Sequence, residues 1–130
     1  MTTKEWLMRA WRIDREIDLL MDARRRALER ATSTTAAPRD VRVSGNSGGN
    51  PMDTYAALSE QIDRRVDELA RVKAEVLEAI ERVPNTTHRQ LLIERYINCK
   101  TMESIAVEMN YSWRQINRLH GRALQEIKMS

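Results

Sequence analysis

Two long stretches in which apolar residues recur every three or four positions limit what this chain can fold into. They cover residues 4–31 and 53–83, and the spacing predicts two long amphipathic α-helices. We expect Asp53 to cap the second helix, which should end before Pro84. The first stripe is Trp6, Ala10, Ile13, Ile17, Leu20 and Ala27, and the second is Tyr55, Leu58, Ile62, Val66, Leu69, Val72, Val76, Ile80 and Val83. Because one helix cannot bury its own stripe, the helices should pack as an antiparallel hairpin or against a second chain.

Residues that form turns are scarce outside one segment. The 130 residues include no Phe, four Gly and three Pro, which leaves few of the turns that a sheet protein needs, so we expect an all-α fold. Residues 32–52 are rich in Ser, Thr, Gly, Asn and Pro and have no apolar period, which predicts a flexible linker. The SGNSGGN sequence within it lacks the Lys-Ser/Thr ending and the preceding strand of a phosphate-binding loop, which argues against nucleotide binding.

The charges are segregated along the chain. The 22 Lys and Arg exceed the 19 Asp and Glu by only three, but residues 84–130 alone hold seven bases against four acids. Residues 53–83 hold eight acids against five bases and mask this excess in the total. The first helix has mixed signs, which favours a solvated outer face. The alternative is that Arg24, Arg25, Arg26 and Arg30 make an auxiliary contact to phosphates.

Residues 84–130 contain signals for three shorter helices. The expected ranges are Thr87–Ile97, Met102–Met109 and Trp113–Lys128. Thr101 can cap the second of them, and Ser112 with Gln115 three residues later forms a capping box that opens the third.

The last two of these helices are predicted to form a helix-turn-helix. Their apolar and small residues have the spacing that lets two helices, joined by a tight turn, cross at a steep angle. The expected core is Ile105, Ala106, Met109, Tyr111, Ile116 and Leu119, closed by Leu91, Leu92 and Tyr96. Ala106 has to be small because the two helices approach most closely there. Asn110 lies at the turn, where the backbone needs a positive φ.

With this core turned inward, the outward face of the last helix is suited to DNA. The candidate DNA-binding residues are Ser112, Trp113, Arg114, Asn117, Arg118, Gly121 and Arg122. The major groove admits one helix, and within it Arg can bond to guanine through two acceptors and Asn can pair with adenine. We therefore expect Arg114, Asn117 and Arg118 at base edges. Ser112 and Arg122 are expected at the phosphate backbone.

The other aromatic and reactive side chains indicate no catalytic or metal chemistry. Trp113 either packs against the turn or stacks on a sugar or a thymine methyl. A lone cysteine, Cys99, excludes an internal disulfide and a cysteine-built zinc site. His88 and His120 lack partners at ligand spacing, and His120 should touch the DNA backbone or a neighbouring helix. We expect no metal, no cofactor and no enzymatic activity. Without a signal peptide or an apolar span, the chain is expected in the cytoplasm, with no membrane partner.

The stretch HRQLLIERYINCKTMESIAVEMNYSWRQINRLHGRAL resembles region 4 of sigma-70-type factors. That region has an L-x-x-R-Y helix, a short helix with I-A and a recognition helix that ends in R-A-L. The similarity is closer to small phage-encoded regulators of the RinA/ArpU type, which join such a domain to long preceding helices. Cys99 and Asn110 stand where relatives often have glycine. The resemblance implies a DNA-binding transcription regulator, often an activator of phage late genes, with 113–124 as its recognition helix.

The expected organisation is a helix at 1–31, a linker at 32–52, a second helix at 53–83 and a DNA-binding domain at 84–130. The leading hypothesis is a sequence-specific regulator that binds double-stranded DNA. A single small helix-turn-helix domain usually binds DNA weakly. We therefore also expect a homodimer through the long helices or docking on host RNA polymerase. The alternative is a DNA-packaging component, such as a small terminase subunit, that oligomerises through the long helices.

Overall fold

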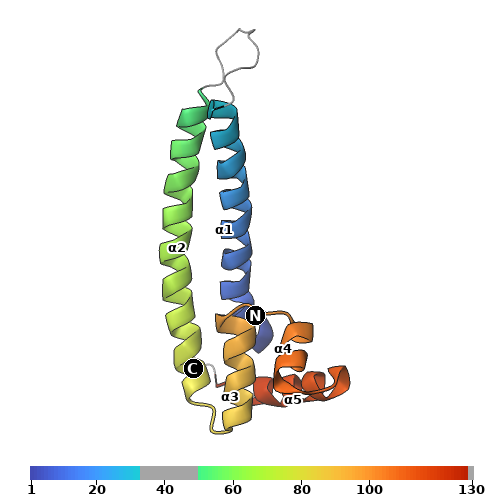
Figure 1. The fold of residues 1–130 in the computed structure, drawn as a ribbon. Helices are drawn as coiled ribbons and strands as arrows, with labels where there is room; N and C mark the ends of the chain where they lie inside the picture. The colour runs from blue at the N-terminus through green and yellow to red at the C-terminus, as the bar shows by residue number, and fades with distance from the viewer. Residues whose placement is uncertain (33–49, 129–130) are drawn as a thin grey trace. The chain divides into compact units, whose positions relative to one another are not determined.

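The structure, a computed structural model, describes residues 1–32 and 50–128. Within these ranges the chain forms five α-helices and one π-helical turn without any strand, which confirms the all-α prediction (Figure 1). The elements are α1 (Thr3–Thr32), α2 (Pro51–Glu81), α3 (Thr86–Leu92), η1 (Ile93–Ile97), α4 (Met102–Met109) and α5 (Trp113–Glu126). The chain divides into two compact units, one of Met1–Asp14 with Glu68–Ser130 and one of Arg15–Asp67.

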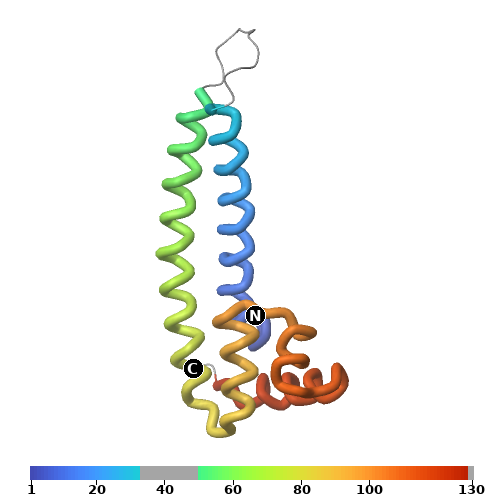
Figure 2. The backbone as a smooth tube through the Cα atoms, viewed as in Figure 1, coloured from blue at the N-terminus to red at the C-terminus, as the bar shows by residue number. Residues whose placement is uncertain are grey.

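In each unit, α1 and α2 run antiparallel to one another (Figure 2). In the unit of Arg15–Asp67, Arg65 Nε lies 2.9 Å from Glu16 Oε2, and Arg24 Nη1 donates to Ser59 Oγ over 3.2 Å. The residue number on α2 thus falls as the number on α1 rises. In the other unit, Arg9 Nη2 of α1 lies 3.1 Å from Glu75 Oε1 of α2. The two stripes therefore meet within one chain, as the hairpin alternative predicted.

The start of α2 differs from the prediction. The helix begins at Pro51, and the side-chain Oδ1 of Asn50 accepts a hydrogen bond of 2.9 Å from the backbone N–H of Met52. Asp53 therefore lies inside the first turn and is not the cap. Pro is favoured at the first helical position because its missing N–H would have no partner there. The linker predicted at 32–52 is too long at both ends, because Thr32 belongs to α1 and Pro51 and Met52 belong to α2. Its residues 33–49, with most of SGNSGGN, lie outside the described residues.

The helix expected at Thr87–Ile97 consists of α3 followed by the π-helical turn η1. It starts one residue early because Asn85 Oδ1 accepts from the N–H of His88 and caps it. It ends where Cys99 adopts a positive φ of 57° and the N–H of Lys100 donates to the carbonyl of Glu94. Cys99 thus adopts the left-handed conformation at the position where the regulators that the sequence resembles often have glycine.

The second and third short helices follow their predicted bounds closely. α4 spans Met102–Met109 as expected, and Thr101 Oγ1 accepts from the N–H of Ser104. α5 ends at Glu126, two residues before the predicted end, because Ile127 is already extended.

These helices enclose the expected core. The fully enclosed cluster is Leu91, Ile105, Ala106 and Ile116, with Met102, Met109, Tyr111 and Leu119 packed against it. Leu92 and Tyr96 are also fully buried, as predicted, and the Tyr96 ring stacks on His120 of α5. Met102 takes part without having been predicted. None of the described helices is long and apolar enough to cross a membrane.

Candidate nucleic-acid interface

A tight turn of residues 110–112 joins α4 to α5. Asn110 adopts the left-handed conformation, with φ 60° and ψ 40°, as the sequence predicted. The next residue, Tyr111, donates its backbone N–H to the carbonyl of Ala106 over 2.9 Å, which closes the end of α4. Ala106 is buried, consistent with a close approach of the two helices.

The start of α5 is fixed by the predicted capping box. Ser112 Oγ accepts from the N–H of Gln115 over 3.1 Å, and Gln115 Oε1 accepts from the N–H of Ser112 over 2.9 Å. Both side chains are therefore engaged in ordering the first turn of the helix.

All seven predicted DNA-binding residues lie on α5 or at its cap, and all are exposed. They are Ser112, Trp113, Arg114, Asn117, Arg118, Gly121 and Arg122. Trp113 is 56% exposed, so more than half of its surface is open to solvent. Asn117 Nδ2 donates to the carbonyl of Trp113 over 2.8 Å, which uses one of its two N–H groups and leaves the other N–H and the Oδ1 acceptor for a further partner.

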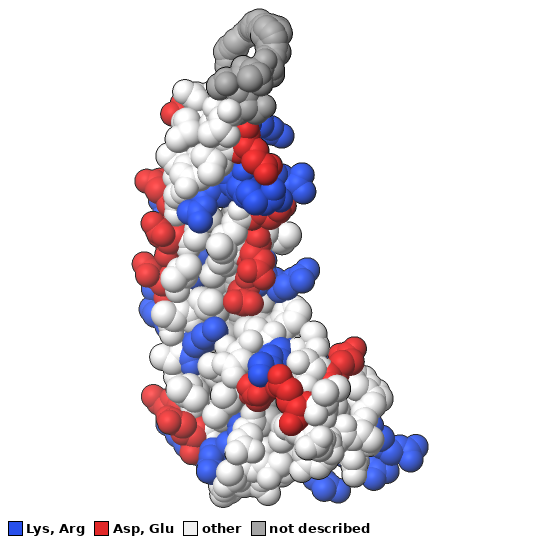
Figure 3. Space-filling model, viewed as in Figure 1, with Lys and Arg blue, Asp and Glu red and all other residues white. Residues whose placement is uncertain are grey.

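The face of α5 is positively charged. Arg114, Arg118 and Arg122 follow one another at intervals of four, and within residues 1–32 and 50–128 no ion pair involves any of them. Figure 3 shows Lys and Arg side chains projecting from the surface over α5. Guanidinium groups without an ion pair attract a polyanion, since their charge is not offset at short range.

Two carboxylates of the same unit, those of Glu94 and Glu108, pair with a lysine. Lys100 Nζ lies 3.0 Å from Glu94 Oε2 and 2.9 Å from Glu108 Oε1. A hydrogen bond from Asn98, followed by that from Lys100, lowers the pKa of Glu94. Glu94 and Glu108 are thus tied to a local cation.

Two long-range contacts hold α5 against the preceding helices. The Tyr96 hydroxyl lies 2.6 Å from His120 Nε2, and the two rings stack with centroids 5.8 Å apart. Near the end of α5, Glu126 Oε1 lies 2.8 Å from Nδ1 of the buried His88. His120 therefore contacts a neighbouring helix, which was one of its two predicted roles. Sequence reasoning missed both contacts, because no local spacing links the partners.

Burial shifts the pKa values of both groups in the contact between Tyr96 and His120. It lowers the pKa of His120 to about 4, with smaller contributions from the charges of Lys4 and Arg95. It also raises the pKa of Tyr96 to about 12. At neutral pH the imidazole is therefore uncharged, and its Nε2 can accept the hydrogen bond that the Tyr96 hydroxyl donates.

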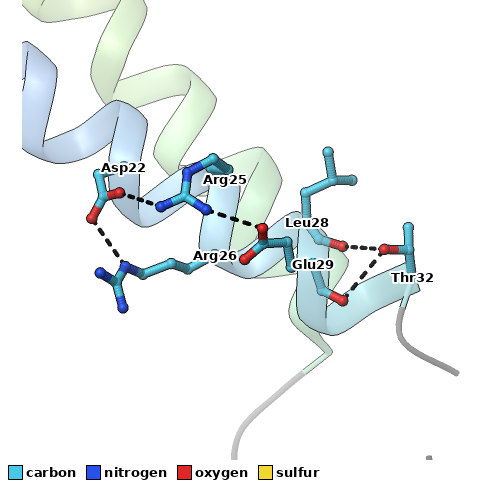
Figure 4. A network of polar contacts seen from close by, with 6 residues as sticks. All are labelled: Asp22, Arg25, Arg26, Leu28, Glu29 and Thr32. Carbon is cyan, nitrogen blue, oxygen red and sulfur yellow. Dashed lines mark hydrogen bonds and ion pairs between the residues drawn. The ribbon is translucent and has the colours of Figure 1, made fainter. Parts of the chain in front are cut away.

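The arginine cluster of α1 has a different environment (Figure 4). Asp22 accepts from Arg25 over 2.6 Å and from Arg26 over 2.9 Å, and Arg25 also pairs with Glu29. Hydrogen bonds from the two arginines lower the pKa of Asp22, with the bond from Arg25 the larger cause. These ion pairs lie on the surface of α1. They favour the prediction of a solvated outer face over that of an auxiliary phosphate contact.

Within the described part of the chain, no group of three or more His, Cys, Asp and Glu is placed to hold a metal ion.

A family model described as "Protein of unknown function (DUF1492)" matches residues 31–128, which is most of the chain. No curated protein and no solved structure matches it.

Proposed function

The chain belongs to the DUF1492 family, and we propose that it is a sequence-specific regulator of transcription that binds double-stranded DNA. In this proposal α4, its turn and α5 act as a helix-turn-helix, and residues 113–124 lie in the major groove. The observation that carries it is the exposed face of α5, where Arg114, Arg118 and Arg122 have no ion pair with any described residue. The groove admits one helix, and a guanidinium can bond to both acceptors of a guanine.

The individual roles follow from position on α5. Arg114, Asn117 and Arg118 bond to base edges, and Asn117 has Oδ1 and a second N–H for this contact beside its bond to the Trp113 carbonyl. Arg122 and the region of Ser112 contact the phosphate backbone. Because the capping box and the contacts of His120 and His88 hold α5 rigidly, little ordering is needed at binding, which favours affinity.

The sequence similarity to RinA/ArpU-type regulators supports a more specific version, an activator of phage late genes that acts in the host cytoplasm. A single small helix-turn-helix domain binds DNA weakly. The protein therefore either dimerises through its long helices or docks on host RNA polymerase. Light scattering at micromolar concentration decides the first point, because a monomer at that concentration excludes the homodimer.

The central test is a selection of bound duplexes from a random pool by the purified chain, which should enrich one motif. Arg118→Ala should then weaken binding to the selected duplex by roughly 1–3 kcal/mol and relax base preference at one position. Arg122→Ala is the matched control and should weaken selected and random duplexes alike. Equal losses on both duplexes in Arg118→Ala would contradict its role in base reading, and no enrichment would contradict sequence-specific binding.

A second candidate is a DNA-packaging component, such as a small terminase subunit that marks viral DNA. The observation that favours it is the exposure of large apolar side chains on the long helices, which indicates further assembly. These residues are Leu19, Met21, Leu28, Met52 and Val66. A ring of eight or more chains in light scattering would support this candidate, whereas a monomer or a dimer would count against it.

A further inference from the structure

A shallow hollow of about 210 Å³ opens beside the turn that precedes α5. The side chains that line it are Tyr111, Gln115, Arg118, Leu119 and Arg122. Four of the five can donate hydrogen bonds, and none is Asp or Glu. A hollow lined by donors and positive charge is suited to an anion of the size of a phosphate.

The capping box orients one of these donors. Gln115 Oε1 accepts from the backbone N–H of Ser112, so its amide nitrogen still carries two N–H groups for another acceptor. Because Gln115 Oε1 is held by this bond, the direction of the amide is set before any ligand arrives. Gln115 is exposed, so an anion can reach it from solvent.

The rest of the hollow is also built in advance. Tyr111 and Leu119 pack against the buried cluster below, which fixes the floor. Gln115 and Arg122 are seven residues apart and thus lie on nearly the same stripe of α5. Arg118 lies on the side nearer Arg114, so its guanidinium borders the hollow and can still extend toward base edges.

We propose that this hollow, hereafter the phosphate seat, holds one phosphodiester of the DNA backbone. The donors are the Gln115 amide, the Tyr111 hydroxyl and the Arg122 guanidinium. The inference rests on the proposed function and adds Tyr111 and Gln115 to its contacts. Phosphate contacts carry no sequence information, but they fix the register of a protein on the duplex. The seat therefore determines how α5 lies in the groove and which bases Arg114 and Asn117 can reach.

The test uses Gln115→Glu in the full chain with a random-sequence duplex, because a phosphate contact does not depend on sequence. Glutamate keeps the capping box, so α5 and its thermal stability should be preserved. It places a carboxylate in the seat instead of two donors, and DNA affinity should fall on the order of tenfold. Gln61→Glu, at an exposed position of α2, adds the same charge elsewhere and should leave the affinity nearly unchanged.

A second variant tests the hydroxyl. Tyr111→Phe keeps the packing against the core and removes one donor, and it should lower the affinity for random duplex about threefold. The third variant, Arg122→Gln, should reduce the slope of log affinity against log salt by about one.

The possible results separate the seat from the proposed function. If Gln115→Glu and Tyr111→Phe bind random duplex as tightly as the unchanged chain, the seat is wrong while DNA binding stands. If the unchanged chain binds no duplex at any salt concentration, the proposed function fails as well.

Inorganic phosphate presents the same acceptor oxygens as a phosphodiester and could occupy the same hollow. An NMR titration in which millimolar phosphate shifts the Gln115 amide, but duplex DNA does not, would assign the seat to a small anion and overturn the inference.

Discussion

The two compact units of the chain differ in how completely they bury their apolar side chains. Among the described residues of the unit of Arg15–Asp67, the buried apolar ones are Ile17, Ala27 and Ile62. Large apolar side chains at five other positions of this unit are at least 40% exposed: Leu19, Met21, Leu28, Met52 and Val66. The unit that contains α3, α4 and α5 encloses a cluster around Ile105 and Ile116, both fully buried. The second of these units thus encloses a compact core although Val107 and Trp113 are exposed, and the first leaves large apolar side chains exposed along both of its helices.

The largest effect should come from a truncation in the closed core. Ile116→Ala removes buried methyl groups and leaves a cavity, so it should lower the free energy of unfolding by about 2–5 kcal/mol. The matched variant Met21→Ala, at a position 46% exposed, should change it by less than about 0.5 kcal/mol in a dilute sample. Urea titrations of both variants measure this contrast. Similar losses at the two positions would erase the difference between the units.

A smaller effect should follow from the buried contact between His120 and Tyr96. The folded pKa of His120, about 4, lies below its ordinary value of 6.5, so the unfolded chain binds the proton more readily. The contribution of His120 to stability should therefore be fully present above its ordinary pKa of 6.5 and be lost as the pH drops toward 4. The expected loss is about 1–2 kcal/mol, after allowance for partial exposure to solvent.

Thermal melting at pH 7 and pH 5 measures whether stability falls as the pH is lowered. His120→Gln cannot take up the proton and should lose less stability between the two values. An equal loss in both proteins would place the titrating group elsewhere.

The smallest effect concerns Gly121, which lies inside α5 and is exposed. An added Cβ would meet nothing within 4 Å, so no packing within the chain explains the glycine. Gly121→Ala should stabilise the protein by about 0.5–1 kcal/mol, because alanine is the better helix former. If the duplex approaches this position closely, the same change should weaken DNA binding. Calorimetry and fluorescence anisotropy measure the two effects, and greater stability with unchanged affinity would remove Gly121 from the interface.

Local signals in the sequence accounted for most of the fold. The apolar period gave both long helices, and the capping residues Thr101 and Ser112 located α4 and α5, because caps depend only on residues three positions away. The predicted turn at Asn110 was confirmed for the same reason. The start of α2 was placed wrongly because both Asn50 and Asp53 are competent caps, and Pro51 decides between them.

Contacts between distant residues could not be predicted. His88 and Glu126 are 38 residues apart, and Tyr96 and His120 are 24 apart, so only the packed helices bring them together. The predicted face of α5 proved to be exposed because its opposite side has a regular apolar stripe, which fixes the orientation of the helix. The hollow beside Tyr111 requires the turn geometry, and no spacing in the sequence reveals it.

The most direct test of the central claim is the salt dependence of binding to a duplex. Affinity for double-stranded DNA, measured by fluorescence anisotropy from low to high salt, should fall steeply in the unchanged chain, because bound phosphates release counterions. The combined change of Arg114, Arg118 and Arg122 to Gln should lower the affinity and flatten this slope. The same change at Arg12, Arg25 and Arg26 of α1 removes equal charge and should leave the slope nearly intact. Equal flattening by both combinations, or a slope near zero in the unchanged chain, would contradict DNA binding by α5.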